Sequence, residues 1–187
     1  MIDKPDAVKR GIAELVRAWS TVHHTLFDIA RPCTDGGCCL PWMQTWAPGP
    51  NYQMSCDFSS ILSPDMFREF IVPEIESYLK VNEYGVYHWD GPDALKHLDA
   101  LLELTSLKAI QYTPGEGQPR TSSPRWMPYY KRIQAAGKRL VLPCTDPDEV
   151  ETIMTGLSSR GLFISTYAAS EDDARALLAR VTALTHE

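Results

Sequence analysis

Apolar residues recur along this chain with two different spacings, and these spacings predict helices that alternate regularly with strands. Residues 5–30 carry apolar side chains at every third or fourth position, which predicts one long helix. Residues 31–51 are rich in Gly, Pro and Cys, so we expect turns there, around at most a short strand. After that segment, short apolar runs alternate with helical patterns as far as residue 185.

Four of the apolar runs have the composition of parallel strands that are buried on both faces. They are "GVYH" at 85–88, "LKAIQY" at 107–112, "RLVLP" at 139–143 and "GLFIST" at 161–166. The helical patterns that follow them cover 92–104, 123–137, 147–159 and 171–185. This alternation predicts right-handed βαβ units on one parallel sheet, with the four strands adjacent in sequence order. Periodicity alone is compatible with an open doubly wound sheet and with part of a (β/α)8 barrel.

A further unit precedes these four. "YQMSCDFSSIL" at 52–62 is typical of a strand followed by a loop. Ser63 is then expected to cap a helix that has Pro64 at its first position and runs to about Val81. Pro73 is expected to bend that helix, because proline lacks the amide hydrogen that a helix interior needs.

Composition excludes several partners and compartments. The net charge is -6 and no basic run is present, so nucleic acid is not an expected partner. No apolar stretch approaches the roughly 20 residues that span a bilayer, and the first residues do not resemble a signal peptide. We therefore expect a cytoplasmic protein that is not bound to membranes.

The cysteines and the short motifs narrow the chemistry further. Five cysteines without a secretion signal predict reduced thiols, and Cys33, Cys38 and Cys39 do not have the paired spacing of a zinc ribbon. The sequence contains no GxGxxG, GxxxxGK[ST], GxSxG or HExxH motif. Dinucleotide, nucleoside triphosphate, serine hydrolase and zincin functions are thereby disfavoured.

Polar side chains collect where the predicted strands end, and that edge carries the functional site in both candidate architectures. Five successive strands end in such residues: Cys56 and Asp57; His88 and Asp90; Tyr112, Thr113 and Glu116; Cys144, Thr145 and Asp146; Thr166 and Tyr167. The expected catalytic residues are His88, Asp90 and Asp57. The expected substrate-binding residues are Tyr112, Glu116 and Tyr167.

His88 and Asp90 form the central pair of this prediction. Side chains two positions apart on an extended segment point to one face, so both are expected to reach the same space. Asp90 is equally well explained as a turn or cap residue, Asp146 is most simply a helix N-cap, and "PGEG" around Glu116 is turn chemistry. The other histidines, His23, His24, His97 and His186, are expected to be structural or exposed to solvent.

Several segments resemble the C-terminal half of the uroporphyrinogen decarboxylase superfamily, which includes cobalamin-dependent methyltransferases that move methyl groups to coenzyme M. The segments are "CDFSSILSPDMFREFIVPEI", "GVYHWDG", "LPCTDPDEV" and "GLFISTYAAS". The resemblance implies a parallel (β/α) barrel of TIM type with its site at the C-terminal rim. Only five or six of the eight units are accounted for, so 1–187 is expected to be a single barrel domain that lacks N-terminal strands. The alternative is a homodimer in which two copies complete each other.

The same resemblance implies a metal. The methyltransferase branch holds zinc with a histidine, a cysteine two residues on and a later cysteine. Here His88 matches the histidine, Asp90 stands at the second position, and the last strand offers "STYAAS" without a cysteine. The expected ligands are therefore His88, Asp90 and Cys144, since zinc accepts all three kinds of donor.

The leading hypothesis is a corrinoid-linked methyltransferase that moves a methyl group between a methylated corrinoid and a small acceptor. Methylcobalamin would be presented by a separate corrinoid protein, because the chain has no DxHxxG motif. The first alternative is a decarboxylase of the uroporphyrinogen type that acts on a carboxylated ring substrate. The second is a non-catalytic fragment with a binding or association role.

Overall fold

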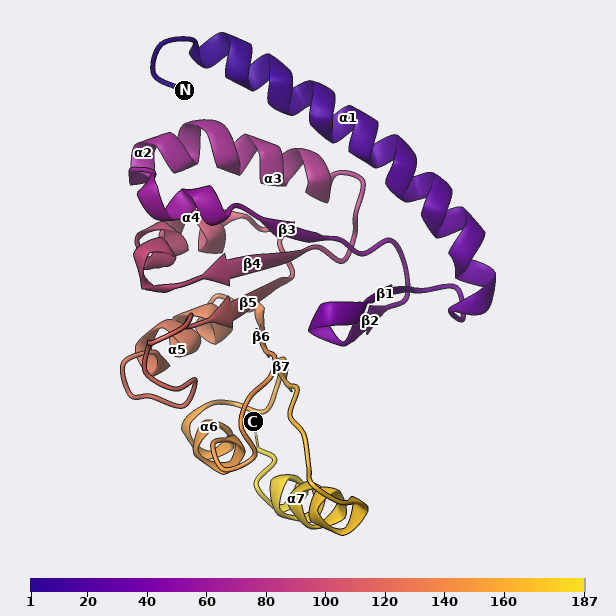
Figure 1. The fold of residues 1–187 in the computed structure, drawn as a ribbon, viewed down its shortest axis with the longest axis vertical. Coiled ribbons are helices and arrows are strands. Elements are labelled where there is room, and N and C mark those ends of the chain that lie inside the picture. Colours follow the sequence, from indigo (N-terminus) through magenta and orange to yellow (C-terminus); the bar gives the residue numbers. More distant parts are fainter. Residues whose placement is uncertain (187) are drawn as a thin grey trace.

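The computed structural model describes residues 1–186 and shows an α/β fold built on a five-stranded parallel sheet (Figure 1). The strands are β3 (Gln53–Ser55), β4 (Val86–Asp90), β5 (Ala109–Thr113), β6 (Arg139–Leu142) and β7 (Leu162–Ile164). They lie in the order β3-β4-β5-β6-β7, and each pairs with its neighbour in parallel. The predicted order and direction of the strands are confirmed. Within the described residues the sheet is open, with β3 and β7 at its edges.

The helices that were predicted from the pattern all form, although several are shorter than expected. They are α1 (Pro5–Ala30), α2 (Pro64–Met66), α3 (Val72–Leu79), α4 (Leu98–Glu103), α5 (Met127–Ala135), α6 (Val150–Gly156) and α7 (Glu171–Ala183). Pro92–His97 forms a 3-10 helix that leads into α4. Pro92 fixes its own φ and has no amide hydrogen to donate, which suits the start of a helix.

The helix that begins after Ser63 follows its prediction closely. The Ser63 hydroxyl accepts a hydrogen bond from the Met66 amide at 3.2 Å, so Ser63 is the N-cap. A π-helical segment, Phe67–Ile71, joins α2 to α3 just before Pro73. A proline here would collide with the carbonyl four residues earlier in a regular α-helix, and the wider turn avoids that collision. The expected distortion at Pro73 thus takes the form of a π-helix.

The two faces of the sheet differ in what covers them. One face packs on α3 to α6 through a continuous core that contains Tyr87, Trp89, Ile110, Tyr112, Leu140 and Leu142. Side chains alternate along a strand, so Val86, Ala109 and Val141 point to the opposite face. There they contact Met43, which is completely buried.

Met43 comes from a hairpin that the sequence pattern did not resolve. Strands β1 (Cys38–Leu40) and β2 (Thr45–Ala47) pair antiparallel, and Pro41–Met43 forms a 3-10 turn between them. Gln44 closes the turn with a φ of 55°, in the left-handed region. The segment was predicted as irregular around at most a short strand. The hairpin instead carries Met43 onto the helix-free face of the sheet.

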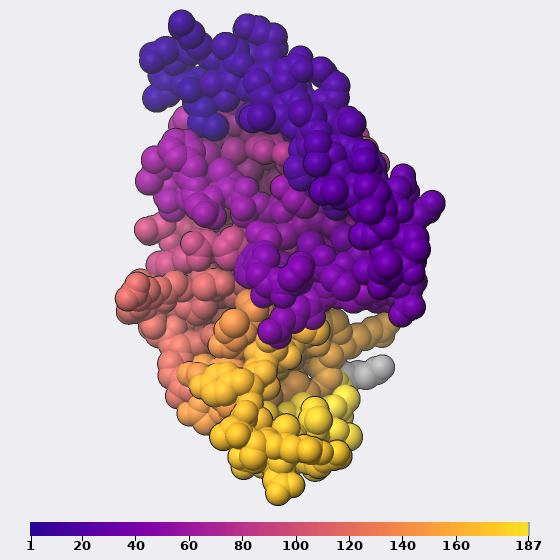
Figure 2. Space-filling model, turned by 45° about the vertical axis from the view of Figure 1, so that its right-hand side comes forward, coloured from indigo at the N-terminus to yellow at the C-terminus, as the bar shows by residue number. Residues whose placement is uncertain are grey.

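The long helix α1 packs on α3 and leaves its other side exposed. Trp19 contacts the rings of Tyr52 and Tyr78, with centroids 3.9 and 4.8 Å away. The exposed side carries Leu15, Val22, Leu26 and Ile29. In the space-filling view α1 and α7 lie toward opposite ends of the molecule (Figure 2). Among residues 1–186 no helix combines the length and the apolar character needed to cross a membrane.

Candidate metal centre

Three ligand-bearing side chains meet at the carboxyl edge of the sheet. His88 and Asp90 lie on β4, two positions apart, and Asp57 follows the end of β3. Ser55 is paired with His88 in the register of the two parallel strands, so the two carboxyl ends coincide. One donor atom from each of Asp57, His88 and Asp90 lies within 4.8 Å of the other two. The predicted pairing of His88 with Asp90 is thus present, with Asp57 beside it.

A short hydrogen-bonded chain holds the imidazole of His88. Its Nδ1 is bonded to Gln111 Oε1 on β5, and the amide nitrogen of Gln111 donates to Thr113 Oγ1 at 2.7 Å. Gln111 is completely buried, which makes its two hydrogen bonds important because a buried amide without partners is costly. With Nδ1 engaged, Nε2 is the ring nitrogen left to bind a ligand.

Trp42 forms a wall beside His88. The two rings meet edge to face, with centroids 5.1 Å apart, and the indole N–H donates to Gln53 Oε1 on β3. Trp42 belongs to the turn of the hairpin, a region for which the sequence pattern predicted no role. Neither Trp42 nor Gln111 was among the predicted site residues. Gln111 was identifiable in principle, since alternation places it on the same face as Ala109 and Thr113.

The donor set suits a divalent metal ion. One imidazole nitrogen and two carboxylate oxygens are ligands that zinc accepts, and three protein ligands leave a position open for substrate. Tetrahedral zinc needs its ligand atoms roughly 3.3 Å apart, given bonds of about 2 Å. Asp57 and Asp90 are exposed, so rotation of their side chains can bring the oxygens closer. The residues present therefore fit the expected metal.

Cys144 is a correction to the predicted ligand set. The group that the structure brings together contains Asp57 in addition to His88 and Asp90, and it does not include Cys144. Cys144 follows β6 in a turn with a φ of 53°, and it lines a separate hollow of about 310 Å³ with Glu116 and Arg120. The expected third ligand was on the correct edge of the sheet but on the wrong strand.

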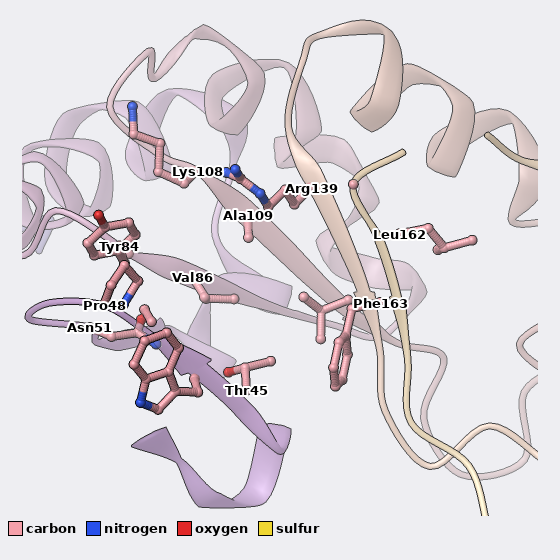
Figure 3. A pocket seen from close by; sticks show the side chains of 15 residues that line it. Thr45, Pro48, Asn51, Tyr84, Val86, Lys108, Ala109, Arg139, Leu162 and Phe163 are labelled. Atoms are coloured by element: carbon pink, nitrogen blue, oxygen red, sulfur yellow. The ribbon is translucent and has the colours of Figure 1, made fainter. Parts of the chain in front are cut away.

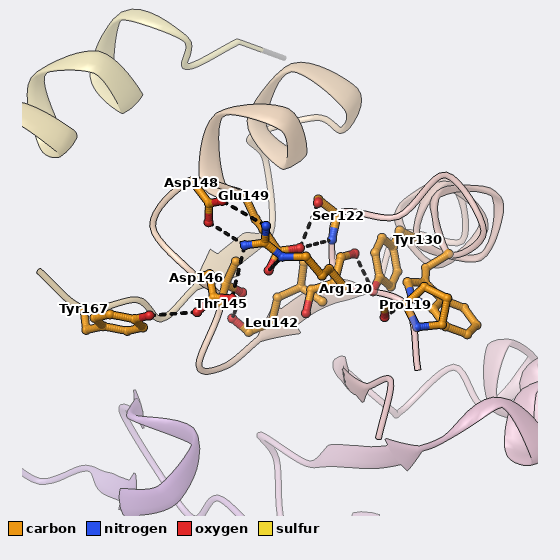
Figure 4. Close-up of polar contacts among 12 residues, drawn as sticks. Pro119, Arg120, Ser122, Tyr130, Leu142, Thr145, Asp146, Asp148, Glu149 and Tyr167 are labelled. Carbon is orange, nitrogen blue, oxygen red and sulfur yellow. Dashed lines mark hydrogen bonds and ion pairs between the residues drawn. The ribbon is translucent and has the colours of Figure 1, made fainter. Parts of the chain in front are cut away.

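The second polar cluster on this edge is centred on Arg120 (Figure 4). Its guanidinium contacts the carboxylates of Asp146 and Asp148, and its Nε lies 3.5 Å from Glu149. Glu149 is buried and accepts hydrogen bonds from the amide and the hydroxyl of Ser122, at 2.7 and 2.8 Å. These contacts fasten the loop that follows β5 to the loop that follows β6.

The cluster also determines the environment of two titratable groups. The hydrogen bond from Arg120 holds the pKa of Asp148 below its ordinary value. The Tyr167 hydroxyl donates to Asp146 at 2.8 Å, and that bond raises the pKa of Tyr167. Arg120 thus links the two loops through its contacts with the surrounding carboxylates.

The prediction that Asp146 is a helix N-cap is wrong. The next helix, α6, begins at Val150, and Glu149 occupies the cap position. The Asp146 carboxylate is bound to Arg120 and Tyr167 instead. The residues between Asp146 and Val150 form a turn, in which the Glu149 amide donates to the Asp146 carbonyl at 3.0 Å.

The three predicted substrate-binding residues do not join His88. Tyr112 points to the helix-covered face, packs on Trp126 and Tyr130, and is only 1% exposed. Its hydroxyl has no hydrogen-bond partner in the described part of the chain. Tyr112 also lines the hollow of Glu116 and Arg120, and its substrate-binding role stays a prediction. Glu116 is exposed and lines the same hollow as Arg120. Tyr167 is exposed, and its hydroxyl donates to Asp146 beside Arg120.

Comparisons with family models, with curated proteins and with solved structures gave no significant match. The resemblance to the uroporphyrinogen decarboxylase superfamily therefore rests on the sequence segments quoted above and stays a prediction. The α/β fold and the meeting of Asp57, His88 and Asp90 are independent of it.

Proposed function

We propose that this chain is a metal-dependent enzyme that transfers a group to or from a small molecule at the carboxyl edge of its sheet. The observation that carries the proposal is the convergence of Asp57, His88 and Asp90 within 4.8 Å. They come from the ends of two neighbouring strands, on the face that the helices leave uncovered. Donors of this kind at this edge of a parallel sheet are typical of catalytic sites.

Each residue has a definite role in the proposal. Asp57, Asp90 and His88 Nε2 hold the ion, with zinc as the expected metal. Bound zinc acts as a Lewis acid and lowers the pKa of a coordinated acceptor. Gln111 fixes the His88 ring, and Trp42 limits how the substrate approaches it.

The specific reaction that we propose is methyl transfer between a methylated corrinoid and a small acceptor. Support comes from the sequence resemblance, together with the order of the strands and the placement of the helices on one face of the sheet. Both features are required of a (β/α) barrel segment. In this proposal methylcobalamin is presented by a separate corrinoid protein, and the acceptor binds at the open metal position.

Metal binding provides the first test. Metal-free protein is titrated with Zn²⁺ in competition with a chromogenic chelator, for the wild type, His88→Ala and Asp90→Asn. We expect one zinc per chain and a loss of affinity of at least about tenfold in both variants. Asp93→Asn is the matched control, because Asp93 is exposed, three residues from Asp90, and outside the group. Equal affinity in all four proteins would refute the metal centre.

Activity provides the second test. Zinc-loaded protein is mixed with methylcobalamin and a panel of small thiols, and the methylated product is identified by mass spectrometry. The reaction should require zinc and should be lost in His88→Ala, while circular dichroism shows that the variant is folded. Zinc binding without transfer to any acceptor would refute methyl transfer and leave the metal site standing.

A further inference from the structure

A separate pocket lies at the opposite, amino edge of the sheet (Figure 3). Its volume is about 540 Å³, and its lining includes Val86, Ala109 and Arg139, the first residues of three adjacent strands. None of Asp57, His88 or Asp90 lines it. The pocket is thus a different site from the candidate metal centre.

Two aromatic walls of this pocket pack against glycines. Trp46 lies so close to Gly37 that a Cβ there would collide with the indole ring, and its N–H donates to the Thr34 carbonyl at 3.1 Å. Tyr84 lies against Gly49, where a Cβ would be 3.0 Å from the phenol ring. Each glycine leaves room for the ring that lies against it, so a side chain at Gly37 or Gly49 would displace or crowd a wall of the pocket.

The floor of the pocket is apolar and consists of buried side chains, whereas the aromatic residues beside it are exposed. Val86, Ala109 and Val141 form it, and Phe163 stands at its side. Phe163 is 37% exposed and Trp46 is 51% exposed. Solvent-facing aromatic rings that surround an apolar hollow are the surface that a planar apolar ligand covers most favourably.

Two cations border the same space. Lys108 and Arg139 lie along one side of the pocket, across from Thr45 and Asn51 (Figure 3). The stem of Arg139 rests on Gly161, since a Cβ there would be 3.5 Å from Arg139 Cγ. Both side chains are exposed, and neither forms an ion pair with any described residue. A free guanidinium and a free ammonium beside an apolar floor favour a carboxylate.

We propose that this pocket binds a small planar molecule that carries a carboxylate, such as an aromatic acid. The ring lies on the apolar floor between the aromatic walls. The carboxylate pairs with the Arg139 guanidinium, and Lys108 adds a second positive charge. The site is independent of the proposed metal centre, so its test does not depend on zinc.

The test uses 2-naphthoate as the probe and follows the quenching of tryptophan fluorescence, checked by isothermal titration calorimetry. We expect saturable binding at one site per chain. Arg139→Gln should weaken it about tenfold or more, because a charge-assisted hydrogen-bonded pair is lost. Lys108→Gln should weaken it less. Arg10→Gln, a change at an exposed arginine on α1, is the matched control and should leave the affinity unchanged.

A neutral probe separates the contribution of the aromatic ring from that of the carboxylate. 2-Naphthalenemethanol has the same rings without the charge, so it should bind wild-type protein more weakly than 2-naphthoate does. Equal affinity of wild type and Arg139→Gln for 2-naphthoate would overturn the proposal. So would the absence of saturable 2-naphthoate binding, or equal binding of the acid and the alcohol.

Discussion

His97 is a core residue of this fold, whereas the sequence left open whether it is structural or exposed to solvent. Its ring stacks on Phe67 with centroids 4.2 Å apart, and Nε2 donates to the Ser59 carbonyl at 2.9 Å. Nδ1 is buried, and no described atom forms a hydrogen bond with it. Protonation would place a charge there without a partner. Burial therefore lowers the pKa of His97 below 6.5, and the nearby charge of Lys96 adds to the effect.

This shift predicts that the protein loses stability in mild acid. The unfolded chain binds a proton at His97 near pH 6.5, whereas the folded chain does so only at lower pH. Stability from the neutral ring is thus fully present above pH 6.5, the unfolded-state pKa. It is lost as the pH falls from there through the lower folded-state pKa. Urea unfolding at about pH 7.5 and about pH 5.5 should show a lower free energy of unfolding at the lower pH.

The His97→Gln variant isolates this contribution, since glutamine can still donate to Ser59 but does not titrate. Its free energy of unfolding should change less between the two pH values than that of the wild type. Burial also lowers the pKa of His23, so the variant still loses some stability as the pH falls. Burial raises the pKa of Glu74, which has the opposite effect on stability at lower pH. His186→Gln, at an exposed position, is the control. An unchanged slope in His97→Gln would contradict the prediction.

At the scale of elements, local capping determines where the helix after β3 begins. Ser63 accepts a hydrogen bond from the Met66 amide, and that amide would otherwise lack an intrahelical acceptor. We predict that Ser63→Ala lowers the free energy of unfolding by about 1 kcal/mol. Chemical denaturation of the two proteins under identical conditions measures this difference.

Ser106→Ala is the matched control, because Ser106 is exposed in the turn before β5 and the described contacts give its hydroxyl no partner. Its free energy of unfolding should stay within about 0.5 kcal/mol of the wild type. Equal effects of the two substitutions would show that the Ser63 cap contributes no specific stability.

At the scale of the whole molecule, apolar surface is left uncovered. Strands β3 and β7 are unpaired on their outer sides within the described chain, and Leu15, Val22, Leu26 and Ile29 are exposed along α1. Such edges and stripes favour association. We predict that the isolated chain binds a hydrophobic dye and self-associates, as analytical ultracentrifugation would show.

A charge on the α1 stripe should reduce this association. Val22→Glu is predicted to shift the sedimentation profile toward monomer, whereas Thr21→Glu, at an exposed residue next to the stripe, should not. The two variants carry the same added charge, so a difference between them reports on the apolar stripe. A monodisperse wild-type monomer with a sharp thermal transition and no dye binding would refute the prediction.

The sequence by itself determined the features that depend on neighbours along the chain. Helical and strand periods predicted the alternation of elements, and short connections predicted the order of the parallel strands. The cap at Ser63 and the shared face of His88 and Asp90 were also predictable, because capping and strand alternation act over two or three residues.

Only the tertiary structure decided which distant residues complete the site. Asp57, not Cys144, lies beside His88, because the register of β3 against β4 brings their ends together. Gln111 reaches His88 because β5 pairs with β4 in that same register, and Trp42 reaches it because the hairpin turns back over the sheet. Register and loop conformation depend on the packing of the whole core, which no local spacing in the sequence encodes.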